Sequence, residues 1–383
     1  MSAKTMSAAE ACEALGIQPA TLYAYVSRGL IRSQARPDSR AKVYLVADVE
    51  RLRQKKSLRH SPESGALHAL DWGLPVLESS VSRITGGSLF YRSHPLEGLL
   101  GCEIEDLVRL LWQQPDWKPS AQAWPAFDAA DSGTFERLQL GLLWAGTRDL
   151  RGFDLSQAGI LASSGRILAG FFAEIAGRQA GDLLGHFAGL DRLRRELLRR
   201  LLIVCADHEL NTSTFTARCV ASARATPYAA VSAGLAALAG RRHGGSTRRT
   251  EALFRVCEQA PSVNAGLRQW LQQEPDLPGC GHRLYPEGDP RWQALEAQLL
   301  RDFGDHPVWL QARAIAEAYA ELELPAPNID FGLAIVARIL AWPAEAPTEA
   351  LVWFALGRVI GWLAHIQEQY GQEAQIRPRA RHT

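Results

Sequence analysis

The sequence lacks several patterns that mark whole classes of proteins. Its six cysteines are scattered without a C-x-x-C pair, so neither a disulfide framework nor a zinc site is indicated and we expect reduced thiols. The N-terminal segment lacks the basic-then-apolar pattern of a signal peptide. We find no apolar run that approaches the roughly 20 residues needed to span a bilayer. These absences predict a soluble, cytoplasmic protein.

Length and charge distribution indicate several folded domains with different partners. The 383 residues are 47% hydrophobic and 22% charged, which is typical of a globular chain of two or three domains. The net charge is +1, yet residues 1–60 contain eleven Lys or Arg against five Asp or Glu. The remaining residues are therefore acidic overall. A basic head on an acidic body suggests that only the head meets a polyanion.

The head begins with helix–turn–helix spacing. Ser7–Glu10 has the spacing of a capping box, which predicts that a helix begins there. Gly16 is expected to end this helix. Pro19 is well placed as the first residue of a second helix, which ends at Gly29.

Further elements complete the pattern of the head. Leu30–Tyr44 predicts a short β-wing, Asp48–Lys56 a third helix, and Ser57–Ser64 a linker. Residues 5–58 thus resemble the winged helix–turn–helix of the MerR and excisionase type, which implies DNA binding. The alternative is a small helical module for protein docking. The candidate DNA-binding side chains are Thr21, Tyr23, Tyr25, Arg28, Arg40 and Lys42.

The segment Gly279–Arg291, GCGHRLYPEGDPR, combines the residue types of an anion site. Gly279 and Gly281 allow the backbone to approach a ligand closely. His282 supplies an imidazole beside them, and Arg291 offers a planar fork for a carboxylate. The loop therefore predicts an anion site with a proton donor, although a histidine that only satisfies loop carbonyls is the alternative.

Three other segments contain candidate residues: ADHELNTSTFTAR (206–218), RRHGG (241–245) and PNIDF (327–331). A metal site at 207–209 is disfavoured because adjacent residues on one helix point in different directions and lack the i, i+4 spacing of metal-binding histidines. His243 closes an Ala-rich helix, where the helix dipole alone would favour it. Asp330 begins an apolar helix, either as a cap or as a partly desolvated base.

In this order and at these separations, the four motifs resemble the citrate synthase family from about Leu67 to Arg379. The resemblance implies an all-α, two-domain fold. It places a large domain at 61–240 and 330–383 and a small domain at 241–329, after a helix–turn–helix domain at 1–60. It also implies a homodimer or higher homo-oligomer that condenses acetyl-CoA, as co-substrate, with oxaloacetate to give citrate and CoA, without a metal or other cofactor.

The resemblance also assigns roles to single residues. Catalysis falls to His243, His282 and Asp330, and substrate binding to His208, Arg291, Arg358 and Arg377. Arg377 would reach the active site of the other subunit, whereas a surface tail is the alternative. Arg358 interrupts the apolar pattern of the last helix, so its burial requires an anionic partner.

Several positions depart from the family pattern. Ser246-Thr247 stands where the family usually has Ala-Asn, and Gly332-Leu333-Ala334 stands where Tyr-Ser-Gly is usual. A lysine is also common near Pro286-Glu287. These departures leave the acyl group open, including propionyl-CoA giving 2-methylcitrate. A regulator that uses the synthase body as a ligand-sensing dimer is the alternative from a different functional class.

Overall fold

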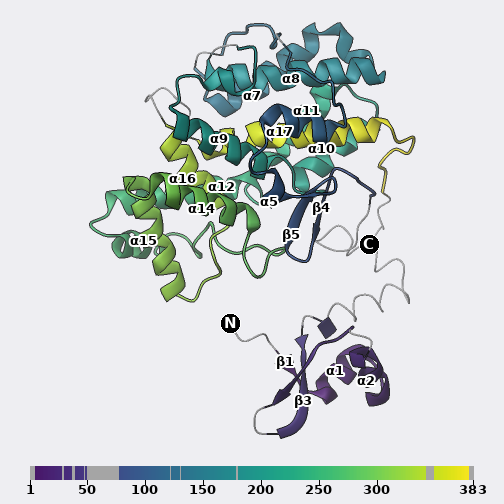
Figure 1. The fold of residues 1–383 in the computed structure, drawn as a ribbon, viewed down its shortest axis with the longest axis vertical. Helices are drawn as coiled ribbons and strands as arrows, with labels where there is room; N and C mark the ends of the chain where they lie inside the picture. The colour runs from purple at the N-terminus through teal and green to yellow at the C-terminus, as the bar shows by residue number, and fades with distance from the viewer. Residues whose placement is uncertain are drawn as a thin grey trace. The chain divides into compact units, whose positions relative to one another are not determined.

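The computed structural model describes residues 5–27, 30–36, 39–46, 48–49, 77–120, 122–129, 131–177, 180–341 and 349–378. The chain divides into two compact units, Met1–Glu78 and Ser79–Thr383 (Figure 1). The predicted boundary at residue 60 lies outside the described residues. The division of the second unit into a large and a small domain stays a prediction.

The described residues of the first unit form two helices and a three-stranded antiparallel sheet of order β1-β3-β2. Its elements are β1 (Thr5–Met6), α1 (Ala8–Leu15), α2 (Pro19–Ser27), β2 (Ser33–Arg36) and β3 (Ser39–Leu45). The predicted capping box is confirmed: Ser7 Oγ accepts the Glu10 N–H at 3.3 Å, and the Glu10 carboxylate accepts the Ser7 N–H at 2.7 Å. Gly16, at φ +56°, ends α1 as predicted.

A small apolar core stabilises this unit. The core residues are Ala11, Leu15, Leu22, Ile31, Tyr44 and Val49. They come from both helices and from the wing, so the predicted wing is confirmed and packs as part of the unit. Of the predicted third helix only Asp48 and Val49 are described, and the predicted linker lies outside the described residues.

The second unit is almost entirely helical, which confirms the predicted fold class. It begins with a small antiparallel sheet of β4 (Ser82–Thr85), β5 (Ser88–Tyr91) and β6 (His94–Pro95). The predicted turn at Gly86-Gly87 joins β4 to β5, and both glycines have positive φ. Its first helical elements are α5 (Leu96–Leu99), α6 (Ile104–Trp112), α7 (Thr134–Arg148), η1 (Leu150–Phe153), α8 (Gln157–Ala176), η2 (Leu184–Phe187) and α9 (Arg192–Cys205). The others are α10 (Thr212–Ser222), α11 (Pro227–Leu238), α12 (Gly244–Gln259), α13 (Val263–Leu271), α14 (Pro290–Phe303), α15 (Pro307–Glu321), α16 (Ile329–Leu340) and α17 (Ala350–Tyr370).

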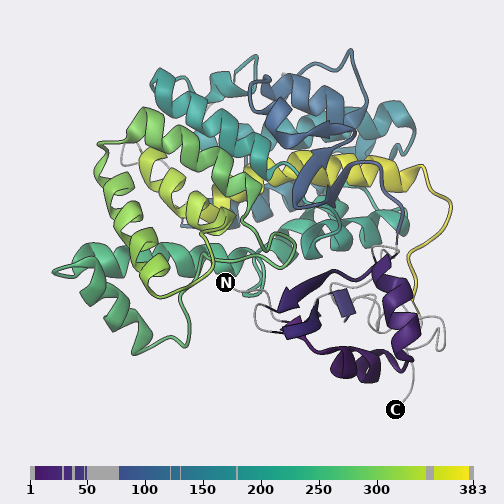
Figure 2. The same cartoon turned by 60° about the horizontal axis from the view of Figure 1, so that its bottom comes forward.

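Helix α17 is the centre of the second unit. Both views show this yellow helix running through the middle of the unit, where it packs against α9, α10, α11 and α16 (Figures 1 and 2). Gly361 permits the closest approach, because a Cβ there would lie 2.1 Å from the carbonyl oxygen of Ala206. The helix therefore supports the α9–α10 connection, where a candidate histidine lies.

Two helices, α8 and α17, are long and apolar enough to cross a membrane by length and composition alone. The expectation that no apolar stretch approaches this length was therefore wrong. Their apolar windows are 72% and 94% buried inside the fold. That burial is typical of core helices, whose apolar surface is covered by other helices on every side.

Candidate active site

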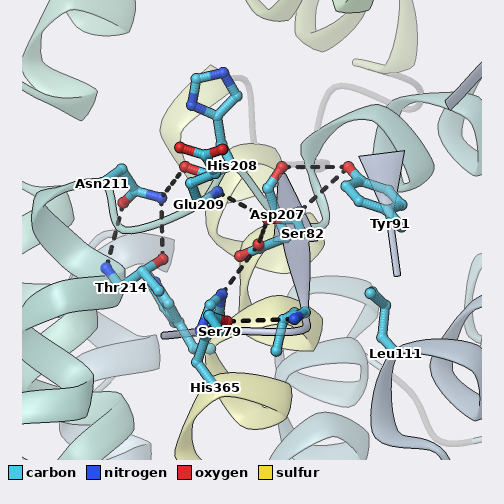
Figure 3. A network of polar contacts seen from close by, with 12 residues as sticks. Ser79, Ser82, Tyr91, Leu111, Asp207, His208, Glu209, Asn211, Thr214 and His365 are labelled. Atoms are coloured by element: carbon cyan, nitrogen blue, oxygen red, sulfur yellow. Dashed lines mark hydrogen bonds and ion pairs between the residues drawn. The ribbon is translucent and has the colours of Figure 1, made fainter. Parts of the chain in front are cut away.

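His208 lies in the connection between α9 and α10 and not on a helix as predicted. The chain leaves α9 after Cys205, Glu209 has φ +49°, and the Asn211 side chain caps α10. Figure 3 shows the His208 ring pointing away from the contact between Asp207 and His365. The prediction was wrong because the strong helical pattern on either side hides a short non-helical connection.

Asp207 holds the connection between α9 and α10 in place. Its Oδ2 lies 3.1 Å from His365 Nε2 and accepts the Ser82 hydroxyl, and both Asp207 and His365 are fully buried (Figure 3). Burial alone would raise the pKa of Asp207, but the neighbouring His365 and Arg358 hold that pKa below its ordinary value. A charged network therefore fixes the backbone that carries His208.

Three aromatic rings form the next part of the site. The ring centroids of His208 and His282 are 5.1 Å apart, and those of His282 and Tyr285 are 4.9 Å apart. The Tyr285 hydroxyl lies 3.0 Å from His208 Nε2. Burial and the positive charges of Arg291 and Arg358 hold the pKa of His208 well below its ordinary value, so its ring is neutral.

The loop around His282 is held against the start of α16. The Asn328 N–H donates to the Gly279 carbonyl at 2.9 Å, and the Asn328 amide donates to the Gly281 carbonyl at 2.8 Å. His282 Nδ1 accepts the Leu284 N–H at 3.2 Å. Burial lowers the pKa of His282 to about 4, with Arg291 adding to the effect. A neutral ring whose Nδ1 is an acceptor carries its proton on Nε2.

Arg291 is buried in a two-point ion pair with Asp289. The Nε–Oδ1 and Nη2–Oδ2 distances are 2.9 and 2.7 Å, and the two side chains are 3% and 1% exposed. Although burial disfavours the charged guanidinium, the Asp289 carboxylate raises the pKa of Arg291. Asp289 Oδ2 also accepts the Ile329 N–H, which begins α16. This pair therefore joins α14 to α16.

His243 lies at the N-terminus of α12, so the interpretation as a C-terminal helix histidine is wrong. Its Nε2 lies 2.9 Å from Ser213 Oγ, which accepts the Trp362 indole N–H at 3.1 Å. Burial lowers the pKa of His243 to about 3, with Arg358 and Arg291 adding to the effect. The ring is neutral, and a hydroxyl on α10 fixes its orientation.

Asp330 lies in the first turn of α16, but its side chain is not the cap. Asn328 caps the helix, because its Oδ1 accepts the Asp330 N–H at 2.9 Å. The carboxylate of Asp330 instead accepts the Thr247 hydroxyl of α12. Burial raises the pKa of Asp330, partly offset by the hydroxyls of Thr247 and Ser246 and by Arg291. A buried carboxylate of this kind is a stronger base than an exposed one.

The two remaining arginines differ in their surroundings. Arg358 is 1% exposed; its Nε donates to the Cys205 carbonyl at 2.8 Å, and its Nη2 is buried with no hydrogen-bond partner among the described residues. Burial lowers the pKa of Arg358, while Asp207 acts in the opposite direction. Arg377 is exposed and follows Ile376, whose N–H donates to Ser222 Oγ. Arg377 is not brought to the other candidates within this chain.

Candidate DNA-binding side chains are partly described. Tyr23 is 57% exposed and Lys42 is exposed, while Thr21 and Tyr25 are half-buried on α2. Arg28 and the side chain of Arg40 lie outside the described residues. The accessible members therefore come from α2 and β3, the second helix and the wing.

Four residues of the site were missed by the sequence analysis: Ser213, Thr247, Tyr285 and Asp289. Three of them, Ser213, Tyr285 and Asp289, lie inside the motifs described above, and the Asp-Pro turn before Arg291 was the available signal for Asp289. Among the residues that the structure describes, no group of three or more His, Cys, Asp or Glu side chains could hold a metal ion.

Comparisons with known proteins agree with this geometry. The Citrate synthase, C-terminal domain family matches residues 169–379, and the MerR HTH family regulatory protein family matches residues 6–61. Citrate synthase 2 of Bacillus subtilis is 35% identical over 192 residues, covering 49% of this chain and 50% of the relative. Citrate synthase of Corynebacterium glutamicum is 32% identical over 197 residues, covering 48% and 44%. The matched part of the chain spans about half the length of these relatives or less.

Solved structures share the fold over a longer part of the chain. Citrate synthase from Pyrobaculum aerophilum superposes with a TM-score of 0.66 at 25% identity, covering 82% of this chain and 91% of that one. The ternary complex of carboxymethyl coenzyme A and oxaloacetate with citrate synthase from Thermoplasma acidophilum has a TM-score of 0.68 at 21% identity, covering 80% of this chain and 93% of that one. With a family match over more than half of its residues, preceded by a MerR-type helix–turn–helix segment, the chain belongs to the citrate synthase family.

Proposed function

We propose that the protein condenses an acyl-CoA thioester, acetyl-CoA in the first instance, with oxaloacetate to give citrate and CoA. The observation that carries the proposal is the pairing of a buried carboxylate, Asp330, with two neutral histidines, His243 and His282. Carbon–carbon bond formation from a thioester requires a base for a weak carbon acid and neutral donors for two oxygens. The site supplies each of these groups.

The first step forms an enol. Asp330 takes a proton from the thioester methyl group while Nδ1 of His243 donates its proton to the thioester oxygen. For Nδ1 of His243 to be this donor, the single proton of the Ser213 hydroxyl must face His243 Nε2, 2.9 Å away, and not Asn211 Oδ1, 2.7 Å away. The Trp362 indole N–H can only donate to Ser213, so it occupies one lone pair of that oxygen and leaves the hydroxyl proton for one of these two acceptors.

The second step forms the carbon–carbon bond. The enol carbon attacks the keto carbon of oxaloacetate, and Nε2 of His282 donates its proton to the developing alkoxide. Arg291 and Arg358 neutralise the substrate carboxylates, and His208 adds a neutral hydrogen bond. Water then hydrolyses the thioester of the product, which releases citrate and CoA.

The experiment measures CoA-thiol release by the purified protein with oxaloacetate plus acetyl-CoA or propionyl-CoA. Asp330→Asn should lower kcat by about a thousandfold or more, since a proton-transfer group is lost, while oxaloacetate binding by calorimetry stays within about threefold. Asp305→Asn, which changes an exposed aspartate, is the matched control. Unchanged turnover in Asp330→Asn would overturn the assignment, and the preferred thioester would decide between citrate and 2-methylcitrate.

The chain is also proposed to act as a homodimer. Leu140, Leu143, Leu150 and Phe153 form an exposed apolar surface along α7 and η1, with Leu150 and Phe153 79% and 70% exposed. Exposed apolar surface of this kind is typical of an interface. A second copy would also allow the exposed Arg377 to reach a partner's site. Light scattering on Leu143→Asp should show monomer where the wild type shows dimer.

A second candidate function is transcription regulation, favoured by the MerR match at residues 6–61 and by the exposed Tyr23 and Lys42. A dimer should then bind a palindrome whose half-sites are about one helical turn apart, with affinity that falls steeply with salt. Lys42→Ala should weaken binding to all sequences and reduce the salt dependence. No binding to genomic fragments at low salt would leave the head as an assembly module.

A further inference from the structure

Ser246 and Thr247 depart from the family pattern and lie next to Asp330, the proposed base. They follow His243 in the first turn of α12, where the family usually has Ala-Asn. The Thr247 side chain is fully buried, and its hydroxyl donates to Asp330 Oδ1. The Ser246 hydroxyl also lowers the pKa of this carboxylate. The residues at these two positions therefore act directly on the proposed base.

The Asp330 carboxylate is held by hydroxyls and by no ion pair among the described contacts. The nearest cation, Arg291, is paired at two points with Asp289. A hydroxyl donor stabilises a buried carboxylate without supplying a full opposite charge. Because Oδ1 is occupied, Oδ2 is the oxygen available to a substrate.

We propose that Thr247 is a positioning residue that keeps Asp330 in its carboxylate form and directs Oδ2 toward the acyl group of the thioester. The proposal rests on the proposed function, in which Asp330 is the base. In this proposal, the base of this chain is held by a hydroxyl group of α12. It also explains how an aspartate whose pKa is raised by burial stays competent at neutral pH.

The charges that face Asp330 define the direction of the effect. Burial raises the pKa of Asp330, the hydroxyls of Thr247 and Ser246 and the Arg291 charge lower it, and Asp289 raises it. On the α9 side the titratable neighbour is Cys205, whose pKa burial raises to about 12, so the thiol is neutral. Loss of the Thr247 hydroxyl should therefore raise the pKa of Asp330 further and protonate the base over a wider pH range.

The test compares Thr247→Val, which keeps the shape but removes the hydroxyl, with Thr247→Ser, which keeps the hydroxyl. Thr247→Val should lower kcat about 10-fold to 100-fold at pH 7, as expected for a lost hydrogen bond to a charged group. The rising limb of its pH profile should move up by about one pH unit, a tenfold change in protonation. The KM for oxaloacetate should stay within about twofold, and Thr247→Ser should restore both parameters.

Thr250→Val is the matched control. Thr250 is a buried threonine one turn further along α12, and its hydroxyl donates to the Ser246 carbonyl within the helix. The Thr250→Val substitution removes a buried hydroxyl that does not contact Asp330. An equal loss of kcat in Thr250→Val, or an unchanged pH profile in Thr247→Val, would overturn the proposal.

A readout without substrate separates this proposal from the proposed function. Infrared difference spectra between wild type and Asp330→Asn isolate the carboxyl band of Asp330 during a pH titration. The same pair of spectra in the Thr247→Val background should show that Asp330 titrates at higher pH. If the wild type releases no CoA, the proposed function fails, yet these spectra still decide whether Thr247 holds the carboxylate. Titration at the same pH in both backgrounds would overturn the proposal.

Discussion

The two sides of the site hold their charged groups in different ways. On the keto-acid side (His208, His282, Tyr285, Asp289 and Arg291), the cation is locked into a two-point ion pair and the rings pack on one another. On the thioester side (Ser213, His243, Thr247 and Asp330), hydroxyls are the partners of the base and of one histidine. In the proposed mechanism, the cation that binds the keto acid is thus paired in advance, whereas the base and the histidine of the thioester side have neutral partners and can change charge during the reaction.

The largest effect should come from breaking the ion pair of the keto-acid side. Asp289→Ala leaves Arg291 buried without its partner and removes the acceptor for the Ile329 N–H. Such a change typically lowers the free energy of unfolding by about 3–5 kcal/mol. Equilibrium unfolding in urea measures this loss in the free energy of unfolding.

The control is Asp302→Ala. Asp302 also makes a two-point pair, with Arg301, but that arginine is 58% exposed. Solvent screens this pair, so the loss should be below about 1 kcal/mol. Similar losses in the two variants would contradict the distinction between a locked, buried cation and an ordinary surface pair.

The second prediction concerns stability at acidic pH. The pKa values of His243 and His282 fall to about 3 and about 4 on folding, so both rings stay neutral in the folded state while the unfolded chain takes up protons near pH 6.5. Folding stability should therefore be unaffected above about pH 6.5 and should fall as the pH drops toward 4, by at most about 1.4 kcal/mol per pH unit for each histidine.

Single substitutions isolate the histidine contributions from those of carboxylates with lowered pKa values, such as Asp207, whose acid titration has the same sign. His243→Gln and His282→Gln should each flatten the dependence of the unfolding free energy on pH between 6.5 and 4. The exposed His94→Gln is the control and should leave that dependence unchanged. A slope that survives in both site variants would show that neither ring is held neutral by burial.

Helix boundaries and turns followed from local patterns, and the fold and the roles of the candidate histidines followed from the resemblance to the citrate synthase family, whereas the partners of these histidines followed from neither. Caps, glycines and helical periodicity are encoded within a few residues, so the capping box at Ser7 and the turn at Gly86-Gly87 were predictable. The contact of Thr247 with Asp330 joins residues 83 positions apart. Periodicity contains no information on such a contact, because it depends on how α12 packs against α16.

Even within the motifs, the sequence could not show whether a residue has a local structural role or belongs to the site. Asp330 has the position of a helix cap, and only the structure shows that Asn328 takes this role. The Asp207–His208–Glu209 run has helical neighbours on both sides, yet the chain bends there. In both cases tertiary contacts override the local preference.

The smallest effect should come from removing one hydroxyl on the keto-acid side. Tyr285→Phe keeps the ring packing against His282 but loses the hydrogen bond to His208 Nε2, which is worth about 1 kcal/mol. If His208 serves only to bind the keto acid, the KM for oxaloacetate should rise about fivefold while kcat changes less than about twofold. Tyr370→Phe, which loses a hydroxyl contact to the Ala225 carbonyl outside the site, should change neither parameter. A fall in kcat at unchanged KM would instead place Tyr285, with His282, among the groups that act on the transition state.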